Sequence, residues 1–366
     1  MELGKVGAGL MQWGTTHIDD KIVNPKGNLS DDDVRQLWKT CRQNGIVFFD
    51  TAEGYGGGTS EVRVREVREW YQAQKDIETG DSSDEAKVIV ATKYLPTLWR
   101  WTRWSFFRAV RGSMERLGVD KIDLLFIHTP IHPLPIEYHV QWACDCVDAG
   151  LVQQIGISNC NSDLTRRAQA VAKKNGKHIA VNQIMLNLLV WDSPKHQQTV
   201  QCCHELGVKI VAYSPIGQGL LTDNLTEEKF QRIRAVKMTG VKFDELYELR
   251  ERLTGLAHKY SCTMAQVSMN WVRGHGATPL VGVRSAAQIE DAAGCTNFEL
   301  TDEEMKSLDD ASLGLSLFDR PLYRRSLFVV FISILQLLYS TDIWYTKVTK
   351  LCSSVLSKMK NQILSW

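Results

Sequence analysis

The sequence lacks the charge excess and the cysteine pairs that mark several large classes of protein. Its 366 residues contain 43 Lys and Arg and 42 Asp and Glu, a formal net charge of +1. Nucleic-acid-binding proteins usually carry a strong positive excess, so no nucleic acid is expected as a partner. None of the nine cysteines forms a C-x-x-C pair. A long chain with this cysteine usage is typical of reduced thiols in a reducing compartment.

The chain also has little that reads as a targeting or membrane-spanning segment. The first ten residues, MELGKVGAGL, contain no apolar stretch of signal-peptide length and no leader rich in Arg and Ser. We therefore expect a cytoplasmic protein, with the chloroplast as the alternative if a leader precedes this chain. The apolar run 327–339 has 13 residues, whereas a membrane-spanning helix needs about 20.

A third absence concerns the fold. The G-x-G-x-x-G motif of open dinucleotide-binding sheets does not follow the first apolar run, VGAGLMQW. Strands are predicted by short continuous apolar runs at 6–13, 46–50, 87–93, 123–128, 153–158, 179–185, 208–214 and 278–283. Helices are predicted at 31–45, 60–74, 102–118, 137–149, 162–176, 195–206, 244–260, 264–274, 285–294 and 301–312.

This alternation of strands and helices predicts parallel strands joined by right-handed crossovers. A closed barrel and an open doubly wound sheet both fit it, and the missing glycine motif favours the barrel. We therefore predict an α/β fold, a (β/α)8 TIM barrel with extra helices over residues 1–315. Residues 316–366 are predicted to form a separate apolar and basic C-terminal extension.

Polar residues follow the predicted strands at the end where a TIM barrel carries its active site. The second strand ends at Asp50, the third at Lys93 and the fourth at His128, and Tyr55 follows Asp50 in a glycine-rich loop. Each residue alone is more typical of a turn, a solvated lysine or a core histidine. Their occurrence at consecutive strand ends favours one shared catalytic site.

The four side chains together suit proton transfer to a carbonyl group. A free tyrosine has a pKa near ~10, and a neighbouring ammonium such as Lys93 lowers that pKa by stabilising the phenolate. Asp50 would hold Lys93 charged, and His128 would orient a carbonyl or relay a proton. Tyr55 is then expected to act as general acid for carbonyl reduction, without a metal.

The motifs around these residues are similar to those of the aldo-keto reductase family, from about residue 6 to 312. The segments GIVFFDTAEGYG, VATKY and IDLLFIHTP resemble those that carry the family's catalytic Asp, Tyr, Lys and His. The matching positions are Asp50, Tyr55, Lys93 and His128. The resemblance implies an NADP(H)-dependent barrel enzyme that reduces aldehydes or ketones, close in style to plant and algal reductases of pyridoxal-like or general aldehydes.

The resemblance also implies a binding site for NADP(H). Its expected residues are Ser158, Asn159, Gln183, Tyr213, Ser214, Pro215, Gly217, Gln218, Gly219, Leu220, Gly282, Arg284, Ser285 and Gln288. In the family, the residues matching Ser158, Asn159 and Gln183 hold the carboxamide, and the one matching Tyr213 stacks on the nicotinamide. Arg284 and Ser285 would hold the 2′-phosphate, since the guanidinium fork suits phosphate oxygens. Ala292 stands where the family commonly has an adenine-contacting Asn.

The substrate side and the tail are interpreted from their side chains. Trp13, Trp99 and Trp191 are expected to form an aromatic wall for the carbonyl substrate, with Arg100 or Arg103 facing an anionic group. The alternative is that these tryptophans pack under the rim. Residues 327–364 form a basic amphipathic pattern that we expect to contact an anionic membrane surface. The alternatives are that this tail packs on the barrel or is disordered.

A second function remains open from sequence alone. A nicotinamide-sensing regulatory protein with little turnover would carry the same four residues. The basic and apolar tail is the feature that favours this alternative. The expected cofactor is NADP(H), the expected partner is a small carbonyl substrate, and a monomer is favoured.

Overall fold

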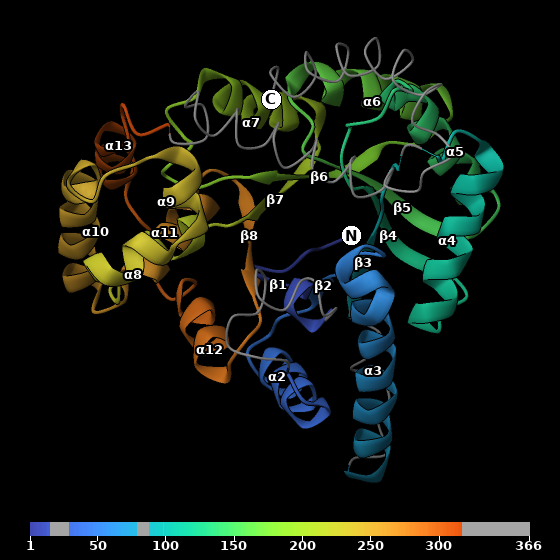
Figure 1. The fold of residues 1–366 in the computed structure, drawn as a ribbon, viewed down its shortest axis with the longest axis horizontal. Helices are drawn as coiled ribbons and strands as arrows, with labels where there is room; N and C mark the ends of the chain where they lie inside the picture. The colour runs from blue at the N-terminus through green and yellow to red at the C-terminus, as the bar shows by residue number, and fades with distance from the viewer. Residues whose placement is uncertain (15–28, 79–87, 98, 317–366) are drawn as a thin grey trace, which may run out of the picture.

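The structure is a computed structural model that describes residues 1–14, 29–78, 88–97 and 99–316. Eight parallel strands close into a barrel in chain order, as the sequence predicts (Figure 1). The strands are β1 Gly7–Gly9, β2 Phe48–Asp50, β3 Ile89–Tyr94, β4 Ile122–Ile127, β5 Val152–Ser158, β6 Ile179–Met185, β7 Lys209–Tyr213 and β8 Ala277–Gly282. The barrel is closed by β1, which pairs with both β2 and β8.

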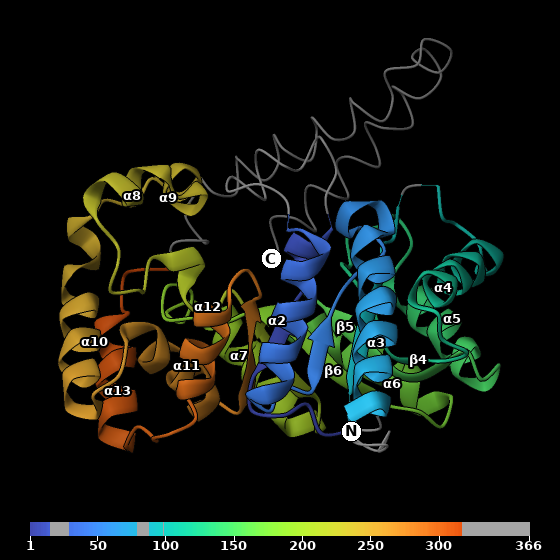
Figure 2. The same ribbon diagram turned by 90° about the horizontal axis from the view of Figure 1, so that it is seen from below.

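Helices surround the barrel on its outside (Figures 1 and 2). They are α2 Asp31–Gln43, α3 Thr59–Glu78, α4 Arg103–Leu117, α5 Ile136–Asp148, α6 Ser162–Lys174, α7 Pro194–Leu206, α8 Glu227–Arg232, α9 Arg234–Thr239, α10 Tyr247–Tyr260, α11 Met264–Gly274, α12 Ala286–Gly294 and α13 Asp302–Ala311. Short 3-10 turns occur at η1 Met11–Trp13, η2 Tyr55–Gly58, η4 Gly217–Gly219 and η5 Asp244–Leu246. Local caps explain several boundaries: Thr301 and Glu304 form the capping box that begins α13.

The inside of the barrel is filled by apolar side chains, including Phe48 and Phe126. Two strand glycines make room for these rings. A β-carbon at Gly7 would lie 2.6 Å from Phe48 Cδ1, and one at Gly156 would lie 2.5 Å from Phe126 Cδ1. Because the interior is packed solid, ligands can only be bound at an end of the barrel.

Two segments differ from the sequence prediction. The predicted first strand, 6–13, is shorter in the structure, because Met11–Trp13 turns into the 3-10 segment η1. The segment between the predicted strand at 208–214 and the predicted helix at 244–260, for which no helix was predicted, contains the short helices α8 and α9. Thr226 caps α8 by accepting a hydrogen bond from the backbone N–H of Lys229.

The C-terminal extension falls almost entirely outside the described residues. The predicted membrane contact of residues 327–364 lies outside them, and the domain boundary at residue 315 stays a prediction. Within the part of the chain that the structure describes, no helix has the length and apolar character needed to cross a membrane.

Candidate active site

The structure brings the four predicted catalytic residues together at the carboxyl ends of β2, β3 and β4. Lys93 Nζ lies 2.5 Å from Asp50 Oδ2 and 3.1 Å from Tyr55 Oη. The rings of Tyr55 and His128 meet edge to face, with centroids 5.8 Å apart and an interplanar angle of 81°. Asp50 and Lys93 are 1% and 0% exposed, so this charge pair lies entirely within protein.

The hydrogen bonds of Lys93 define the direction in which Tyr55 can act. An ammonium has three N–H groups. In this site they are donated to Asp50 Oδ2, to the carbonyl oxygen of Thr51 at 2.8 Å and to Tyr55 Oη. Tyr55 therefore accepts from Lys93, and its own O–H stays available for another acceptor. A carbonyl oxygen is an acceptor of the required kind.

The backbone around Tyr55 explains why this loop is rich in glycine. Gly56, Gly57 and Gly58 have φ values of 60°, 63° and 99°, in the left-handed region that favours glycine. Gly14 of the preceding loop lies so close that a β-carbon there would collide with the backbone carbonyl of Tyr55. The glycines thus allow a tight turn that returns the phenol to the strand ends.

The electrostatic environment of Lys93 and Tyr55 differs from what the sequence predicted for the pKa of Tyr55. Burial alone would lower the pKa of Lys93, but Asp50 and Tyr55 raise that pKa above its ordinary value. Burial raises the pKa of Tyr55 and outweighs the lowering effect of Lys93. The expected net lowering of the Tyr55 pKa is therefore wrong for this structure. The phenol keeps its proton at neutral pH, as a proton donor must.

His128 is a neutral imidazole in this environment. Burial, and then the nearby charge of Lys93, lowers the pKa of His128 to about 3. Within the described residues, His128 Nδ1 is buried and has no hydrogen-bond partner. Asn159 Nδ2 donates to the His128 carbonyl oxygen at 3.2 Å and fixes its backbone. A neutral histidine suits orienting a carbonyl better than relaying a proton.

The residues expected to hold the nicotinamide lie beside this cluster, at the ends of β5, β6 and β7. Ser158 Oγ donates to the carbonyl oxygen of Gln183 at 3.0 Å, and Tyr213 Oη donates to Asn159 Oδ1 at 2.8 Å. Asn159 has a φ of 59°, a backbone conformation that non-glycine residues seldom adopt. Such strain is common at functional sites. The ring of Tyr213 stays partly exposed.

The NADP(H)-binding residues expected at 214–220 begin where β7 ends. Ser214 and Gln218 have φ values of 53° and 58°, and Gly217 and Gly219 also have positive φ. Pro215 and Leu220 are buried, and the carbonyl oxygen of Leu220 accepts a hydrogen bond from Arg250 at 2.9 Å. The turn is therefore anchored at its two ends and leaves Gln218 exposed between them. Its contact with a cofactor stays a prediction.

The expected phosphate site lies between β8 and α12. Gly282 pairs with Gly9 of β1, and Arg284, Ser285 and Gln288 are exposed. Ser285 caps α12, because its hydroxyl accepts from the backbone N–H of Gln288 at 3.4 Å. No described acidic residue forms an ion pair with Arg284.

This arrangement leaves a guanidinium and a helix N-terminus available together, which fits a phosphate group. Ala292, in the same helix, is buried in a hydrophobic cluster with Ile289 and Cys295.

Two of the three predicted substrate tryptophans make packing contacts, and for both a contact with the substrate stays a prediction. Trp13 is 0% exposed, and its indole N–H donates to the carbonyl oxygen of Val283 at 3.3 Å. Trp191 packs edge-on against Trp271 of α11, with ring centroids 5.4 Å apart. Both therefore contribute to the packing of the helical layer. Trp99 is 58% exposed, and its substrate contact stays a prediction.

The two arginines suggested for an anionic substrate are already paired. Arg100 binds both carboxylate oxygens of Glu53, and Arg103 Nε pairs with Asp145. Glu53 also accepts a hydrogen bond from the backbone N–H of Leu95. Sequence reasoning missed Glu53, although its place between Asp50 and Tyr55 was a signal. The Glu53–Arg100 pair ties the loop after β2 to the loop after β3.

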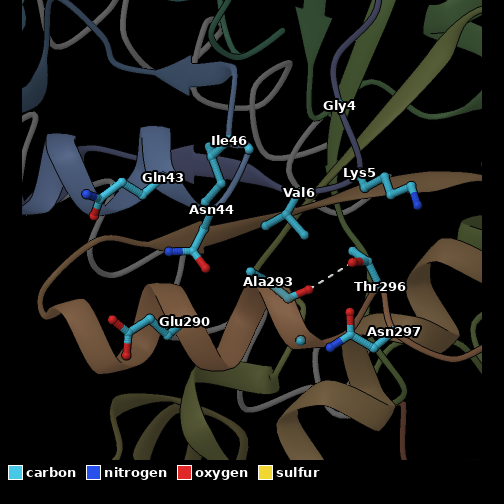
Figure 3. Close-up of a pocket in the computed structure, with 12 residues that line it drawn as sticks. Gly4, Lys5, Val6, Gln43, Asn44, Ile46, Glu290, Ala293, Thr296 and Asn297 are labelled. Carbon is cyan, nitrogen blue, oxygen red and sulfur yellow. Dashed lines mark hydrogen bonds between the residues drawn. The ribbon is translucent and has the colours of Figure 1, made fainter.

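A cavity of about 590 Å³ lies at the other end of the barrel (Figure 3). It is lined by residues that precede β1 and β2 and by the end of α12, with Thr296 Oγ1 donating to the Ala293 carbonyl oxygen at 3.0 Å. None of the four clustered residues lines it. Among the described residues, no group of His, Cys, Asp and Glu could hold a metal ion.

The chain is similar to known proteins over most of its length. A family model described as "Aldo/keto reductase family" matches residues 5–313. The chain is 27% identical over 316 residues to "Pyridoxal reductase, chloroplastic" of Arabidopsis thaliana, covering 85% of each protein. It is 26% identical over 317 residues to "Probable aldo-keto reductase 1" of Glycine max, covering 85% of this chain and 86% of that one.

Solved structures support the barrel fold. A thermostable aldo-keto reductase crystallised with the inhibitor epalrestat superposes with a TM-score of 0.62 at 21% identity, over 85% of this chain and 96% of that chain. A putative 2,5-diketo-D-gluconic acid reductase B gives a TM-score of 0.60 at 21% identity, over 84% and 87% of the two chains.

Proposed function

The chain belongs to the aldo/keto reductase family, a family of oxidoreductases that act on carbonyl groups, and we propose that it reduces an aldehyde or ketone to the alcohol with NADPH. The observation that carries this proposal is the buried contact of Lys93 with both Asp50 and Tyr55. It leaves one polarised phenol O–H at the end of the barrel. NADPH, when bound, supplies the hydride.

In the proposed mechanism, Tyr55 donates its proton to the carbonyl oxygen of the substrate. The charged Lys93 then stabilises the phenolate that forms, and Asp50 keeps Lys93 charged. Neutral His128 orients the carbonyl toward Tyr55. In the reverse direction, the Tyr55 phenolate accepts the proton of the alcohol.

The cofactor residues follow from the same end of the barrel. Ser158, Asn159 and Gln183 would hold the carboxamide, and the partly exposed ring of Tyr213 would stack on the nicotinamide. Arg284 and Ser285 would hold a 2′-phosphate, which favours NADPH over NADH. Support for this comes from the exposure of Arg284 and the absence of an acidic partner for it among the described residues.

The substrate class is proposed from the relatives and from the rim. One relative is named a pyridoxal reductase. Trp99 is exposed in the loop after β3, and Arg100 and Arg103 are engaged by Glu53 and Asp145. An uncharged aromatic aldehyde therefore fits this rim better than an anionic one.

The direct test uses the purified full chain. NADPH binding is followed by fluorescence quenching, and pyridoxal or 4-nitrobenzaldehyde is then added while NADPH absorbance is recorded. We expect saturable binding and oxidation of one NADPH for each alcohol formed, with NADH as the matched control cofactor. Tight NADPH binding without oxidation by any of several aldehydes would contradict the proposal and favour a cofactor-sensing protein.

A further inference from the structure

A hydrogen bond across the barrel connects Gln183 of β6 to Asp50 of β2. Gln183 Nε2 donates to Asp50 Oδ1 at 2.8 Å, although the two residues are 133 positions apart in the sequence. The strands β2 and β6 are not neighbours in the barrel, so the contact crosses its interior. Asp50 and Gln183 are 1% and 3% exposed, which shields this hydrogen bond from water.

With the hydrogen bond from Gln183, each oxygen of the Asp50 carboxylate has a donor. Asp50 Oδ2 accepts from Lys93, and Asp50 Oδ1 accepts from Gln183. Because an ionised carboxylate only accepts hydrogen bonds, the side-chain amide of Gln183 must point its NH2 group at Asp50. The two donors come from β3 and β6, so they fix both the position and the rotation of the carboxylate.

Gln183 is itself held rigidly by its backbone. Its carbonyl oxygen accepts from Ser158 Oγ at 3.0 Å and from the backbone N–H of Asn159 at 2.8 Å. The residue also pairs in register with Val211 of β7. A side chain on a strand fixed from both sides can set the geometry of the group it contacts.

We propose that Gln183 is a positioning residue for proton transfer: its amide keeps Asp50 ionised and turned toward Lys93, and so holds Lys93 against Tyr55. This role is separate from the carboxamide contact that the family resemblance implies for Gln183. Its consequence for catalysis rests on the proposed function, whereas its consequence for Asp50 does not.

The physical reason is the cost of a buried charge. A buried carboxylate that loses one of two donors shifts toward its protonated form. A protonated Asp50 no longer pairs with Lys93 as an ion. The titratable groups that face Asp50 are Lys93 and Tyr55, and His128 lies beside them.

The test is the titration of Asp50 in the full chain, without cofactor or substrate. The carboxyl carbon of Asp50 is followed by carbon-13 NMR and assigned by its loss in Asp50→Asn. In Gln183→Met, which keeps the length and loses the donor, we expect the pKa of Asp50 to rise by about one to two pH units. An unchanged Asp50 pKa in folded Gln183→Met would overturn the proposal.

A matched control separates this effect from general damage to the core. Gln169 of α6 is also a buried glutamine, and it bonds to the backbone of Ile179 in β6 but not to Asp50. Gln169→Met should lower stability and leave the Asp50 pKa where it was. If Gln183→Met does not fold, Gln183→Glu serves instead. It should raise the Asp50 pKa further, because two carboxylates then compete for one site.

Catalysis gives the second readout. If the chain reduces aldehydes, the rate of single-turnover NADPH oxidation should be measured as a function of pH. The apparent pKa of its acid limb should rise in Gln183→Met by the same amount as the Asp50 pKa. A shifted Asp50 pKa without turnover in any variant, the parent chain included, would remove the proposed function and leave the Gln183–Asp50 coupling intact. An unshifted acid limb in an active Gln183→Met enzyme would remove the positioning role.

Discussion

The two sides of the barrel's carboxyl end differ in how far their polar groups are already bonded. On the β2–β4 side, Asp50 and Lys93 are buried and satisfied by protein partners. On the β8–α12 side, Arg284 and Ser285 are exposed, and Arg284 has no acidic partner among the described residues. Proton transfer requires groups fixed in a dry site, whereas a phosphate-binding site must keep its charge free for the ligand.

Lowering the pH should have the largest effect, because it reduces stability through buried histidines on the β2–β4 side of the barrel. Burial lowers the pKa of His128 to about 3, of His132 in the loop after β4 to about 4 and of His139 in α5 to about 3, below the ordinary 6.5 of the unfolded chain. Below pH 6.5 the unfolded state therefore binds more protons than the folded state does. Stability present above that pH should be lost toward pH 4, by up to ~1.4 kcal/mol per pH unit for each histidine.

Urea unfolding between pH 6.5 and about pH 5 measures this slope. In His139→Phe the slope should decrease by the share of one histidine, because one proton fewer is taken up on unfolding. A slope that is the same in His139→Phe and the parent would show that His139 does not titrate in this way.

Lys93→Met should produce the next largest effect, again on the buried side. It leaves the Asp50 charge buried without its ionic partner, which costs about 3–5 kcal/mol of stability, and it should lower single-turnover reduction by about a thousandfold. The double variant Asp50→Asn/Lys93→Met should recover stability but not activity. Recovery of both would show that the pair has only a structural role.

Arg284→Ala tests the exposed side. We expect NADPH binding to weaken by about 10–100-fold, because a charge-assisted hydrogen bond is lost. NADH binding and the free energy of unfolding should change little. Equal weakening of NADPH and NADH in fluorescence titrations would remove Arg284 from the 2′-phosphate site.

Gly14→Ala should have the smallest effect on the rate of reduction, because it acts only by displacing the backbone of Tyr55. The new β-carbon would press on the Tyr55 carbonyl and displace the phenol, for an expected loss of about tenfold in the rate of reduction at saturating NADPH. Gly255→Ala in α10 is the control, since nothing lies within 4 Å of its β-carbon position and its φ is not in the left-handed region. A Gly14→Ala rate equal to that of the parent would show that the loop adapts.

The sequence was informative where one local signal decides the structure. Continuous apolar runs predicted the strands, and the helix predicted at 301–312 is found as α13, which Thr301 caps. The polar residue at each strand end predicted the cluster of Asp50, Lys93 and His128, because a closed barrel brings these ends together.

Contacts between distant segments could not be predicted in the same way. An indole near a strand end looks the same in sequence whether it lines a site or packs under it, as Trp13 does. The balance of burial against the Lys93 charge at Tyr55 depends on desolvation, which only the packed structure defines. The Gln183–Asp50 bond joins strands on opposite sides of the barrel, and no local pattern reports it.

The central claim, that Tyr55 is the proton donor, is tested most directly by Tyr55→Phe. Hydride transfer from NADPH to an aromatic aldehyde should be measured in a single turnover, together with the dissociation constant for NADPH. Tyr247→Phe, which changes an exposed tyrosine of α10, is the control. The account predicts unchanged NADPH binding and a rate about a thousandfold lower in Tyr55→Phe alone. A Tyr55→Phe rate equal to that of Tyr247→Phe would contradict it.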